Sequence, residues 1–152
     1  MSANASAISS TAYARSQGAP SATSGLVTLV GRFFFALIFL MSGPRHFLSQ
    51  TIAYAAAQGV PMASIAVPFS GLLALSGGLL ILFGYRAKIG GWLIALFLLG
   101  VTPMMHNFWA VRDPMMHQMQ MIMFMKNLAM LGGALLITQF GAGPLSLDFR
   151  KN

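Results

Sequence analysis

The sequence predicts an all-α integral membrane protein, a polytopic four-helix bundle with both termini in the cytoplasm. Of its 152 residues, 57% are hydrophobic and only 7% are charged, whereas about a quarter of the residues in soluble domains are charged. The apolar residues gather in four runs of about 20 residues, the length at which an α-helix crosses a hydrocarbon core of about 30 Å. We therefore expect the lipid bilayer to be the main partner of this chain.

Composition also excludes several classes of function. The net charge is +7, but the basic residues stand singly at the ends of apolar runs, as helix anchors do, so we do not expect nucleic acid as a partner. With no cysteine in the chain, it offers no thiolate chemistry and no cysteine-ligated metal site. The sequence contains no paired carboxylates, no nucleophile elbow and no glycine-rich phosphate loop, and we assign no catalytic residue.

The N-terminal part is a polar tail followed by a first span. Residues 1–24 are rich in serine and alanine, and we expect a disordered cytoplasmic tail rather than an organellar transit peptide. The first span covers about residues 26–47, and it lacks a cleavage site before Arg45, so it is not expected to be a signal peptide. Strong helix formers in the connector, residues 48–60, predict a short interfacial helix.

Three more spans complete a domain that covers residues 25–144. Basic or proline-containing turns separate them, and Gly141-Ala142-Gly143-Pro144 ends the last one. We place the spans at about residues 62–83, 89–109 and 117–140, with a short cytoplasmic tail over residues 145–152. Small residues recur four apart at Ser70, Ala74 and Gly78, a spacing that favours close helix packing over a glycine-lined cavity.

Basic residues in the short loops predict the orientation, because they are enriched on the cytoplasmic side. Six of them fall on one side and two on the other. The first set is Arg15, Arg32, Arg86, Lys88, Arg150 and Lys151, and the second is Arg45 and Arg112. Both termini are therefore expected in the cytoplasm, which an even number of spans allows.

The best leads to function are the polar residues at membrane depth, because such side chains are costly in lipid and should face the protein interior. They fall in the outer half of the predicted bundle, where we expect a cavity for a quinone or an anion. The candidate ligand-binding residues are Arg45, His46, His106, Asn107, Lys126 and Asn127. Lys126 has no acidic partner in any span, and the alternative for its side chain is to extend outward toward the headgroups.

Methionines occur at six positions from Met115 to Met125. Their soft thioethers suit copper(I). However, the run crosses from a loop into a helix, so its members point in several directions, and methionine also fills gaps in ordinary helix packing. We expect no metal site here, and copper binding stays as an open alternative.

Short motifs follow one another in a fixed order over about residues 26–150. They are Gly31-Arg32, Phe39-Leu40-Met41-Ser42-Gly43, Gly59-Val60-Pro61, Gly77-Gly78, Leu82-Phe83-Gly84, His106-Asn107-Phe108, Phe124-Met125-Lys126-Asn127-Leu128, Gly132-Gly133, Gly141-Ala142-Gly143 and Leu145-Ser146-Leu147-Asp148. In this order they resemble the DoxX family of small bacterial membrane proteins. The resemblance implies a multi-pass inner-membrane location and a link to respiratory redox chemistry, since the family takes its name from a subunit that passes electrons to quinone. Members commonly carry a glutamate where this chain has Ala74, so any mechanism through that carboxylate does not transfer.

Two functions fit these observations best. The first is a quinone-linked redox subunit or accessory of a respiratory or oxidative-stress complex, with no intrinsic cofactor and with the electron carrier supplied by a protein partner. The second is a non-catalytic assembly or anchoring subunit, whose helices pack in a larger complex or against other copies of the chain. A small anion transporter is less favoured, because four short spans do not make a complete pore. Whether the chain is an enzyme stays open.

Overall fold

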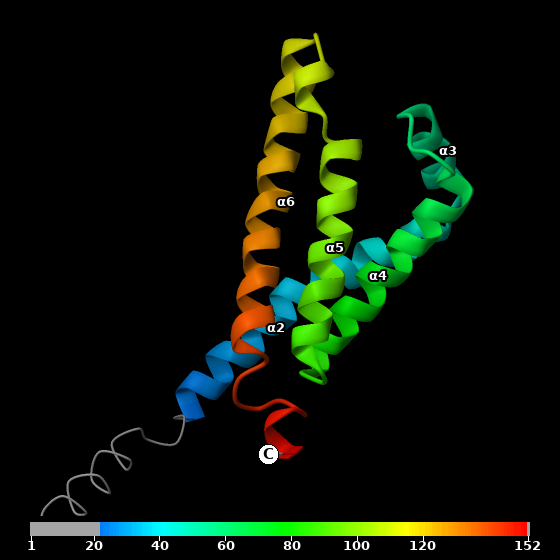
Figure 1. The fold of residues 1–152 in the computed structure, drawn as a ribbon. Helices are drawn as coiled ribbons and strands as arrows, with labels where there is room; N and C mark the ends of the chain where they lie inside the picture. Colours follow the sequence, from blue (N-terminus) through cyan, green and yellow to red (C-terminus); the bar gives the residue numbers. More distant parts are fainter. Residues whose placement is uncertain (1–21, 152) are drawn as a thin grey trace, which may run out of the picture.

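The computed structural model describes residues 22–151, and it is helical throughout apart from short connections (Figure 1). The four long helices are α2 (Ala22–Ser42), α4 (Ala63–Phe83), α5 (Ala87–Met105) and α6 (Pro114–Phe140). The shorter segments are η1 (Gly43–Phe47), α3 (Ser49–Ala57), η2 (Phe108–Ala110) and η3 (Phe149–Lys151). The predicted tail lies almost wholly outside the described residues.

All four long helices are long and apolar enough to cross a membrane, which confirms the four predicted spans. They cover Thr23–Phe47, Ala63–Phe83, Ala87–Ala110 and Pro114–Phe140. The predicted connector helix is also present, as α3. The last span begins three residues before its predicted start, because Asp113 caps it: the carboxylate accepts a hydrogen bond from the Met116 N–H at 2.8 Å, and Pro114 suits the first helical position.

The helices pack as a series in which α4 and α5 are central. The α5 helix packs along both α4 and α6, and α2 packs against α4. Figure 1 shows α5 and α6 side by side, while α4 leans away from them toward α3.

We call this splayed end, which carries η1, α3 and η2, the loop end. The opposite end, which carries the start of α2, the α4–α5 turn and η3, is the terminal end. The two ends of the described chain therefore lie at the same end of the molecule.

Glycine pairs bring the central helices together. A Cβ atom added to Gly77 would lie 3.0 Å from the carbonyl oxygen of Gly90, and one added to Gly91 would lie 2.9 Å from that of Ala134. In lipid, helices gain no hydrophobic driving force, so such backbone approach is a main source of packing energy. The small-residue strip predicted for the second span is a packing surface, since a Cβ on Gly78 would lie 3.1 Å from Leu40.

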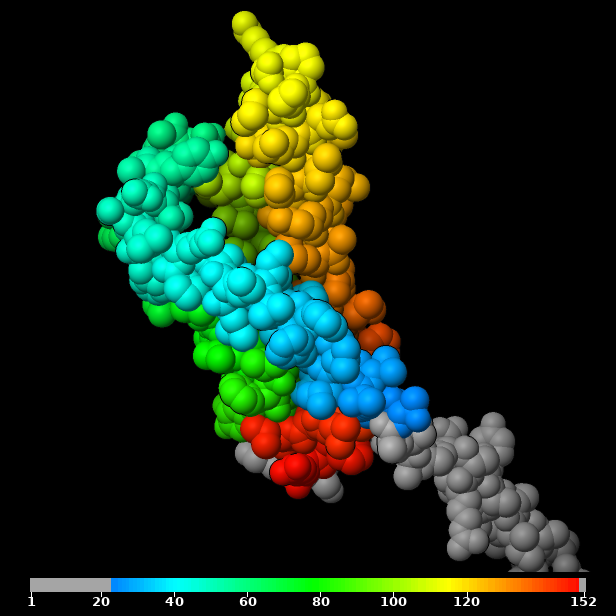
Figure 2. Space-filling model, turned by 180° about the vertical axis from the view of Figure 1, so that it is seen from behind, coloured from blue at the N-terminus to red at the C-terminus, as the bar shows by residue number. Residues whose placement is uncertain are grey.

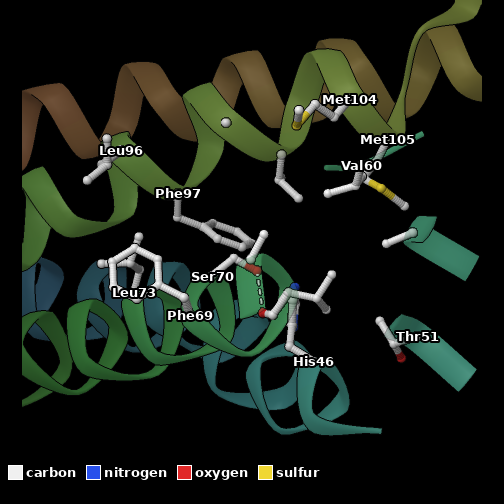
Figure 3. A pocket seen from close by; sticks show the side chains of 15 residues that line it. His46, Thr51, Val60, Phe69, Ser70, Leu73, Leu96, Phe97, Met104 and Met105 are labelled. Carbon is white, nitrogen blue, oxygen red and sulfur yellow. Dashed lines mark hydrogen bonds between the residues drawn. The ribbon is translucent and has the colours of Figure 1, made fainter. Parts of the chain in front are cut away.

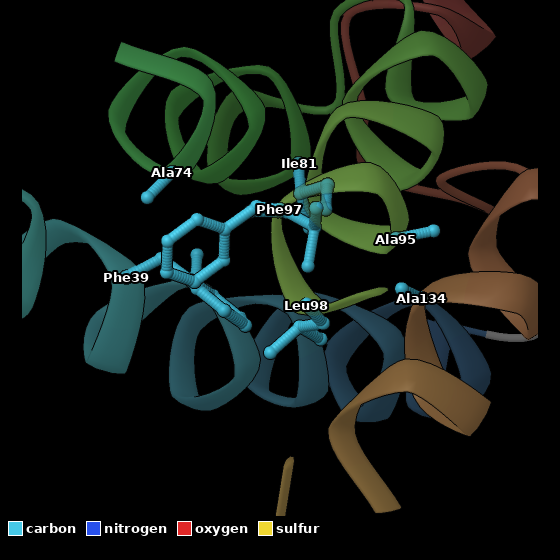
Figure 4. Packing of buried hydrophobic residues seen from close by; sticks show 9 residues of the cluster. Phe39, Ala74, Ile81, Ala95, Phe97, Leu98 and Ala134 are labelled. Atoms are coloured by element: carbon cyan, nitrogen blue, oxygen red, sulfur yellow. The ribbon is translucent and has the colours of Figure 1, made fainter. Parts of the chain in front are cut away.

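The buried core lies where α2, α4 and α5 meet. Its aromatic centre is Phe39 against Phe97, with ring centroids 6.1 Å apart and edge to face. Ala74 is fully buried beside Phe39 (Figure 4). Position 74 is thus an apolar packing site in this chain, where a carboxylate would be buried without water.

Candidate ligand cavity between η1, α4 and α5

A cavity of about 300 Å³ opens at the loop end, where α4 diverges from α5. Figure 2 shows that the molecule is hollowed there, between the segment of η1 and α3 on one side and α5 on the other. Aliphatic, aromatic and methionine side chains form most of the wall, and His46, Thr51 and Ser70 are its polar members (Figure 3). The apolar residues around it include Phe69, Leu73, Leu96, Phe97, Met104 and Met105.

Local sequence explains why η1 can place a histidine in this wall. The α-helix gives way to a tighter turn at Gly43, with Pro44 at its start. A Cβ on Gly71 would lie 2.7 Å from the Cβ of His46, and one on Gly43 would lie 2.6 Å from the side chain of Leu75. These two glycines therefore let η1 lie directly against α4, and that contact fixes the direction of His46.

His46 is the ionisable group of the cavity. Its Nδ1 lies 3.1 Å from the carbonyl oxygen of Ser42. A carbonyl can only accept, so we assign the proton of the neutral ring to Nδ1, which leaves Nε2 as an acceptor. The ring meets Phe97 edge to face at 5.6 Å, and Figure 3 shows it beside Ser70 and Phe97. The cavity thus offers one nitrogen base in apolar surroundings.

The two hydroxyl groups differ in what they can offer. Ser70 donates to the carbonyl oxygen of Val67 at 2.7 Å, so it keeps only acceptor capacity. The Thr51 hydroxyl has no hydrogen-bond partner within residues 22–151 and is available both to donate and to accept. A ligand with one or two oxygen atoms on an apolar ring fits this distribution of groups.

The structure separates the six residues predicted to bind a ligand. His46 lines the cavity, while Asn127 is 6% exposed and lines a second cavity of about 220 Å³ between α5 and α6. Lys126 is exposed on α6, and its Nζ lies 3.2 Å from the sulfur of Met123. Arg45 is exposed at the loop end. These side chains point in different directions. Their joint binding of one ligand stays a prediction, and it would require that the helices move or that a partner protein completes the site.

His106 and Asn107 form the end of the α5–α6 hairpin. The Nδ1 atom of His106 lies 2.8 Å from Oε1 of Gln120, a bond that ties the end of α5 to α6. The backbone carbonyl of Asn107 accepts from the Ala110 N–H at 2.9 Å within η2. Neither residue lines the cavities at His46 or Asn127, and ligand binding by these two residues stays a prediction.

The second cavity contains polar groups that the sequence does not reveal. Thr102 is buried there beside Asn127, and neither side chain has a hydrogen-bond partner among the described residues. Pro103 has no N–H, so the carbonyl of Leu99 lacks its usual helical donor. Both residues line this cavity. Leucine and phenylalanine side chains form most of the wall, so this is an apolar cavity inside the α5–α6 interface with Thr102 and Asn127 as its polar side chains.

Sequence reasoning also missed residues whose roles depend on remote contacts. Arg32 is counted in the sequence as a basic residue near a membrane surface, yet it is 4% exposed. Thr51 and Phe97 belong to no recognisable motif. They line the cavity only because α3 and α5 fold beside η1. An arginine six residues inside the first span was a usable signal, because a charge at that depth demands partners.

The described residues contain no group of three metal-ligating histidine or carboxylate side chains. The methionines at the start of α6 are largely exposed, Met115 and Met119 among them, while Met104 and Met105 line the cavity. Copper binding by thioethers alone stays untested.

Four helices that can each cross a membrane define a multi-pass integral membrane protein. The model of the DoxX family matches residues 27–107, and the chain belongs to the DoxX family. The model of the SURF4 family matches residues 69–152. The resemblance drawn from the sequence motifs is therefore confirmed.

Two bacterial relatives are similar over most of their length. The chain is 28% identical to inner membrane protein YphA of Escherichia coli, over 82% of this chain and 90% of that protein. It is 33% identical to inner membrane protein YqjF of the same organism, over 79% and 88% of the two chains. Together with the four apolar helices, these similarities place the chain in the inner membrane as a multi-pass protein.

A eukaryotic protein is similar over a shorter stretch. The chain is 31% identical to the ER-derived vesicles protein ERV29 of Saccharomyces cerevisiae, over 55% of this chain and 26% of that protein. No solved structure matches the chain.

Proposed function

We propose that this inner-membrane protein is a quinone-linked redox accessory whose cavity at the loop end holds a quinone ring. The observation that carries the proposal is the placement of His46. Its Nδ1–H is held by the Ser42 carbonyl, so Nε2 is left as the nitrogen acceptor for a ligand, beside the hydroxyl groups of Thr51 and Ser70 in a largely apolar cavity.

The cavity suits a quinone for three physical reasons. A quinone ring is flat and apolar, so Phe69 and Phe97 offer matching faces. Its oxygen atoms need a few hydrogen-bonding groups, which His46 and Thr51 supply. Its isoprenoid tail dissolves in lipid, and it can therefore reach a cavity between transmembrane helices without crossing water.

The chemistry assigned to this chain is proton transfer. When a quinol is oxidised, it loses two protons and two electrons. Nε2 of His46 accepts one proton from a ring hydroxyl, and the second proton leaves to water at the loop end. The chain contains no cysteine pair that could take up two electrons. Both electrons therefore pass to a redox cofactor of a partner subunit.

Quinone content measured after gentle purification from native membranes tests the proposal. We expect quinone to co-purify with the wild-type chain, and His46→Phe to lower its affinity about tenfold, the usual effect of losing one hydrogen bond of about 1.4 kcal/mol. Gly100→Leu should block the cavity, because Gly100 lines it and an added Cβ meets no atom within 4 Å.

Gly132→Leu is the matched control. Gly132 also has open space around an added Cβ, but it lies on α6 and does not line the cavity. This variant should keep the quinone. A wild-type protein that carries no quinone and shows no shift in melting temperature with added short-chain quinone would overturn the proposal.

We also propose that both termini lie in the cytoplasm. The support is the predicted distribution of basic residues, six on the terminal side and two on the loop side. Because the chain has no native cysteine, single cysteines placed at Ser2 and Arg112 can be labelled without background. An impermeant maleimide applied to intact spheroplasts should label the Arg112 position only; labelling of Ser2 alone would reverse the orientation.

The exposed face of α6 supports a second candidate, an assembly or anchoring subunit. Lys126 is exposed about midway along α6, although a charged side chain at that depth normally faces protein. A partner helix, from another protein or from a second copy, would cover it. Photo-crosslinking from position 126 in native membranes should then capture a discrete protein, and lipid adducts alone would count against this candidate.

A further inference from the structure

The C-terminal segment after α6 is folded onto the α4–α5 turn at the terminal end. The Asp148 N–H donates to the carbonyl of Gly84 at 2.8 Å. In return, the Asp148 carboxylate accepts from the N–H groups of Arg86 and Ala87, at 2.7 and 2.9 Å. These last two groups begin α5, so a residue some 60 positions later in the chain caps this helix.

Arg32 lies beneath this segment with its hydrogen bonds incomplete. One terminal nitrogen, Nη2, donates to the carbonyl of Leu145 at 2.7 Å. The other two nitrogens, Nε and Nη1, are buried without a partner among the described residues. A desolvated guanidinium with unused donors is costly unless a negative charge lies close. Arg32 therefore gives this end of the molecule a positive charge that the described residues compensate only in part.

Asp148 carries the carboxylate whose negative charge acts on Arg32, but its two oxygens already accept the backbone N–H groups that begin α5. Arg86 and Lys88 add two more positive charges at the same turn. Three cations and one carboxylate thus lie at this turn, and an anionic ligand would correct the balance of charge.

A cavity of about 620 Å³ lies at this turn. Arg86, Lys88, Ser146 and Asp148 line its polar part, and Ile89, Phe140 and Phe149 line its apolar part. The carboxylate of Asp148 is engaged by the N–H groups that begin α5. Arg32 lies behind the wall: a Cβ added to Gly84 would meet Nη1 of Arg32 together with the Cβ atoms of Ser146 and Ala142. Ser146 and Ala142 themselves line the cavity.

We propose that this cavity binds the phosphate headgroup of an anionic phospholipid. Arg86 and Lys88 contact the phosphate, Arg32 supplies a buried positive charge behind it, and the apolar residues contact the first carbons of an acyl chain. The apolar wall favours a lipid over a free phosphate ion, which gains nothing from Phe140 or Ile89. The place of the cavity, at the ends of spans α4, α5 and α6, is the depth at which headgroups lie.

The test compares lipid retention by the full chain after transfer from mixed bilayers into mild detergent. Wild-type protein is equilibrated with equal amounts of phosphatidylglycerol and phosphatidylcholine, and the bound lipids are counted by native mass spectrometry. We expect preferential retention of phosphatidylglycerol. The double variant Arg86→Gln with Lys88→Gln should retain about tenfold less of it, since each cation near an anionic headgroup adds to the affinity.

The matched control is Arg45→Gln with Arg112→Gln, which removes the same charge from the loop end. It should retain phosphatidylglycerol as the wild type does. Equal loss in both double variants would show a general charge effect and overturn the site. Displacement of the lipid by excess inorganic phosphate, with equal affinity for phosphate alone, would overturn the lipid assignment in favour of a free anion.

A second readout concerns Arg32 itself. In the wild type and in Arg32→Lys, which keeps the charge, added phosphatidylglycerol should raise the melting temperature. In Arg32→Met this lipid-dependent rise should be lost, even if the protein starts from a lower melting temperature. An undiminished rise in Arg32→Met would remove Arg32 from the proposal. If Arg32→Met does not fold, the lipid retention of the double variant Arg86→Gln with Lys88→Gln decides the test.

Discussion

At the residue scale, burial and neighbours separate side chains that look alike in the sequence. Arg32 and Arg45 are both basic residues of the first span, yet Arg32 is buried under the C-terminal segment and Arg45 is exposed. His46 and His106 are both half-buried histidines, but only His46 reaches the cavity at the loop end, while His106 is bonded to Gln120. The chemical role of each side chain therefore depends on its few contacts with neighbouring residues.

Gly84 gives a residue-scale prediction. Its φ of +63° lies in the left-handed region, which costs a residue with a side chain about 1 kcal/mol, and an added Cβ would meet Nη1 of Arg32. Gly84→Ala should therefore lower the melting temperature in detergent by several degrees. Gly31→Ala, where the added Cβ meets nothing within 4 Å, should leave it unchanged or raise it. Equal melting temperatures in the two variants would contradict this account.

At the element scale, the ends of the helices are held by different means. Asp113 caps α6 locally, and an Asp-Pro sequence before a helix indicates this role. Asp148 caps α5 from the far end of the chain, and nothing in the local sequence of α5 reveals it. The first kind of cap stabilises one helix, whereas the second also fixes the C-terminal segment in place.

Removing the two caps should therefore have different effects. Asp148→Ala loses two charge-assisted hydrogen bonds and should destabilise the protein by about 1–2 kcal/mol. It should also free residues 141–151 for digestion by carboxypeptidase. Asp113→Ala should cost less, about 1 kcal/mol or below, and leave the C-terminal segment protected. Protection of that segment in Asp148→Ala would show that other contacts hold it.

At the scale of the whole molecule, the crossing of α4 and α5 joins the two halves of the chain. It depends on Gly77 and Gly90, whose backbones approach too closely for any side chain. From this crossing the helices splay toward the loop end (Figure 1), and the cavity with His46 occupies the space that results. The close packing at the terminal end and the splaying at the loop end thus both result from this one helix crossing.

Gly77→Leu tests the importance of this crossing. An added Cβ would lie 3.0 Å from the Gly90 carbonyl oxygen and 2.9 Å from Ile94, so the helices must separate, at a cost of about 3 kcal/mol or more. We expect loss of the monodisperse peak in fluorescence-detected size-exclusion chromatography. Gly132→Leu, which has open space, should keep that peak. A normal profile for Gly77→Leu would show that the crossing adapts.

The sequence by itself determined the four spans, the connector helix and the family. A helix in lipid must satisfy its backbone hydrogen bonds within its own segment, so length and hydropathy are enough to place it. The family is likewise carried by short motifs along the chain. The depth of each polar residue also follows from its distance to the end of its span, and for this reason the sequence drew attention to His46 and Asn127.

Only the tertiary structure decided which polar residues share a space. Depth says nothing about direction around a helix, and so the sequence grouped Lys126 with His46, although one is exposed and the other lines the cavity. The contacts of Arg32 with Leu145 and of Asp148 with Arg86 join residues 113 and 62 positions apart. Contacts of this kind depend on how whole helices cross, and local patterns do not encode that information.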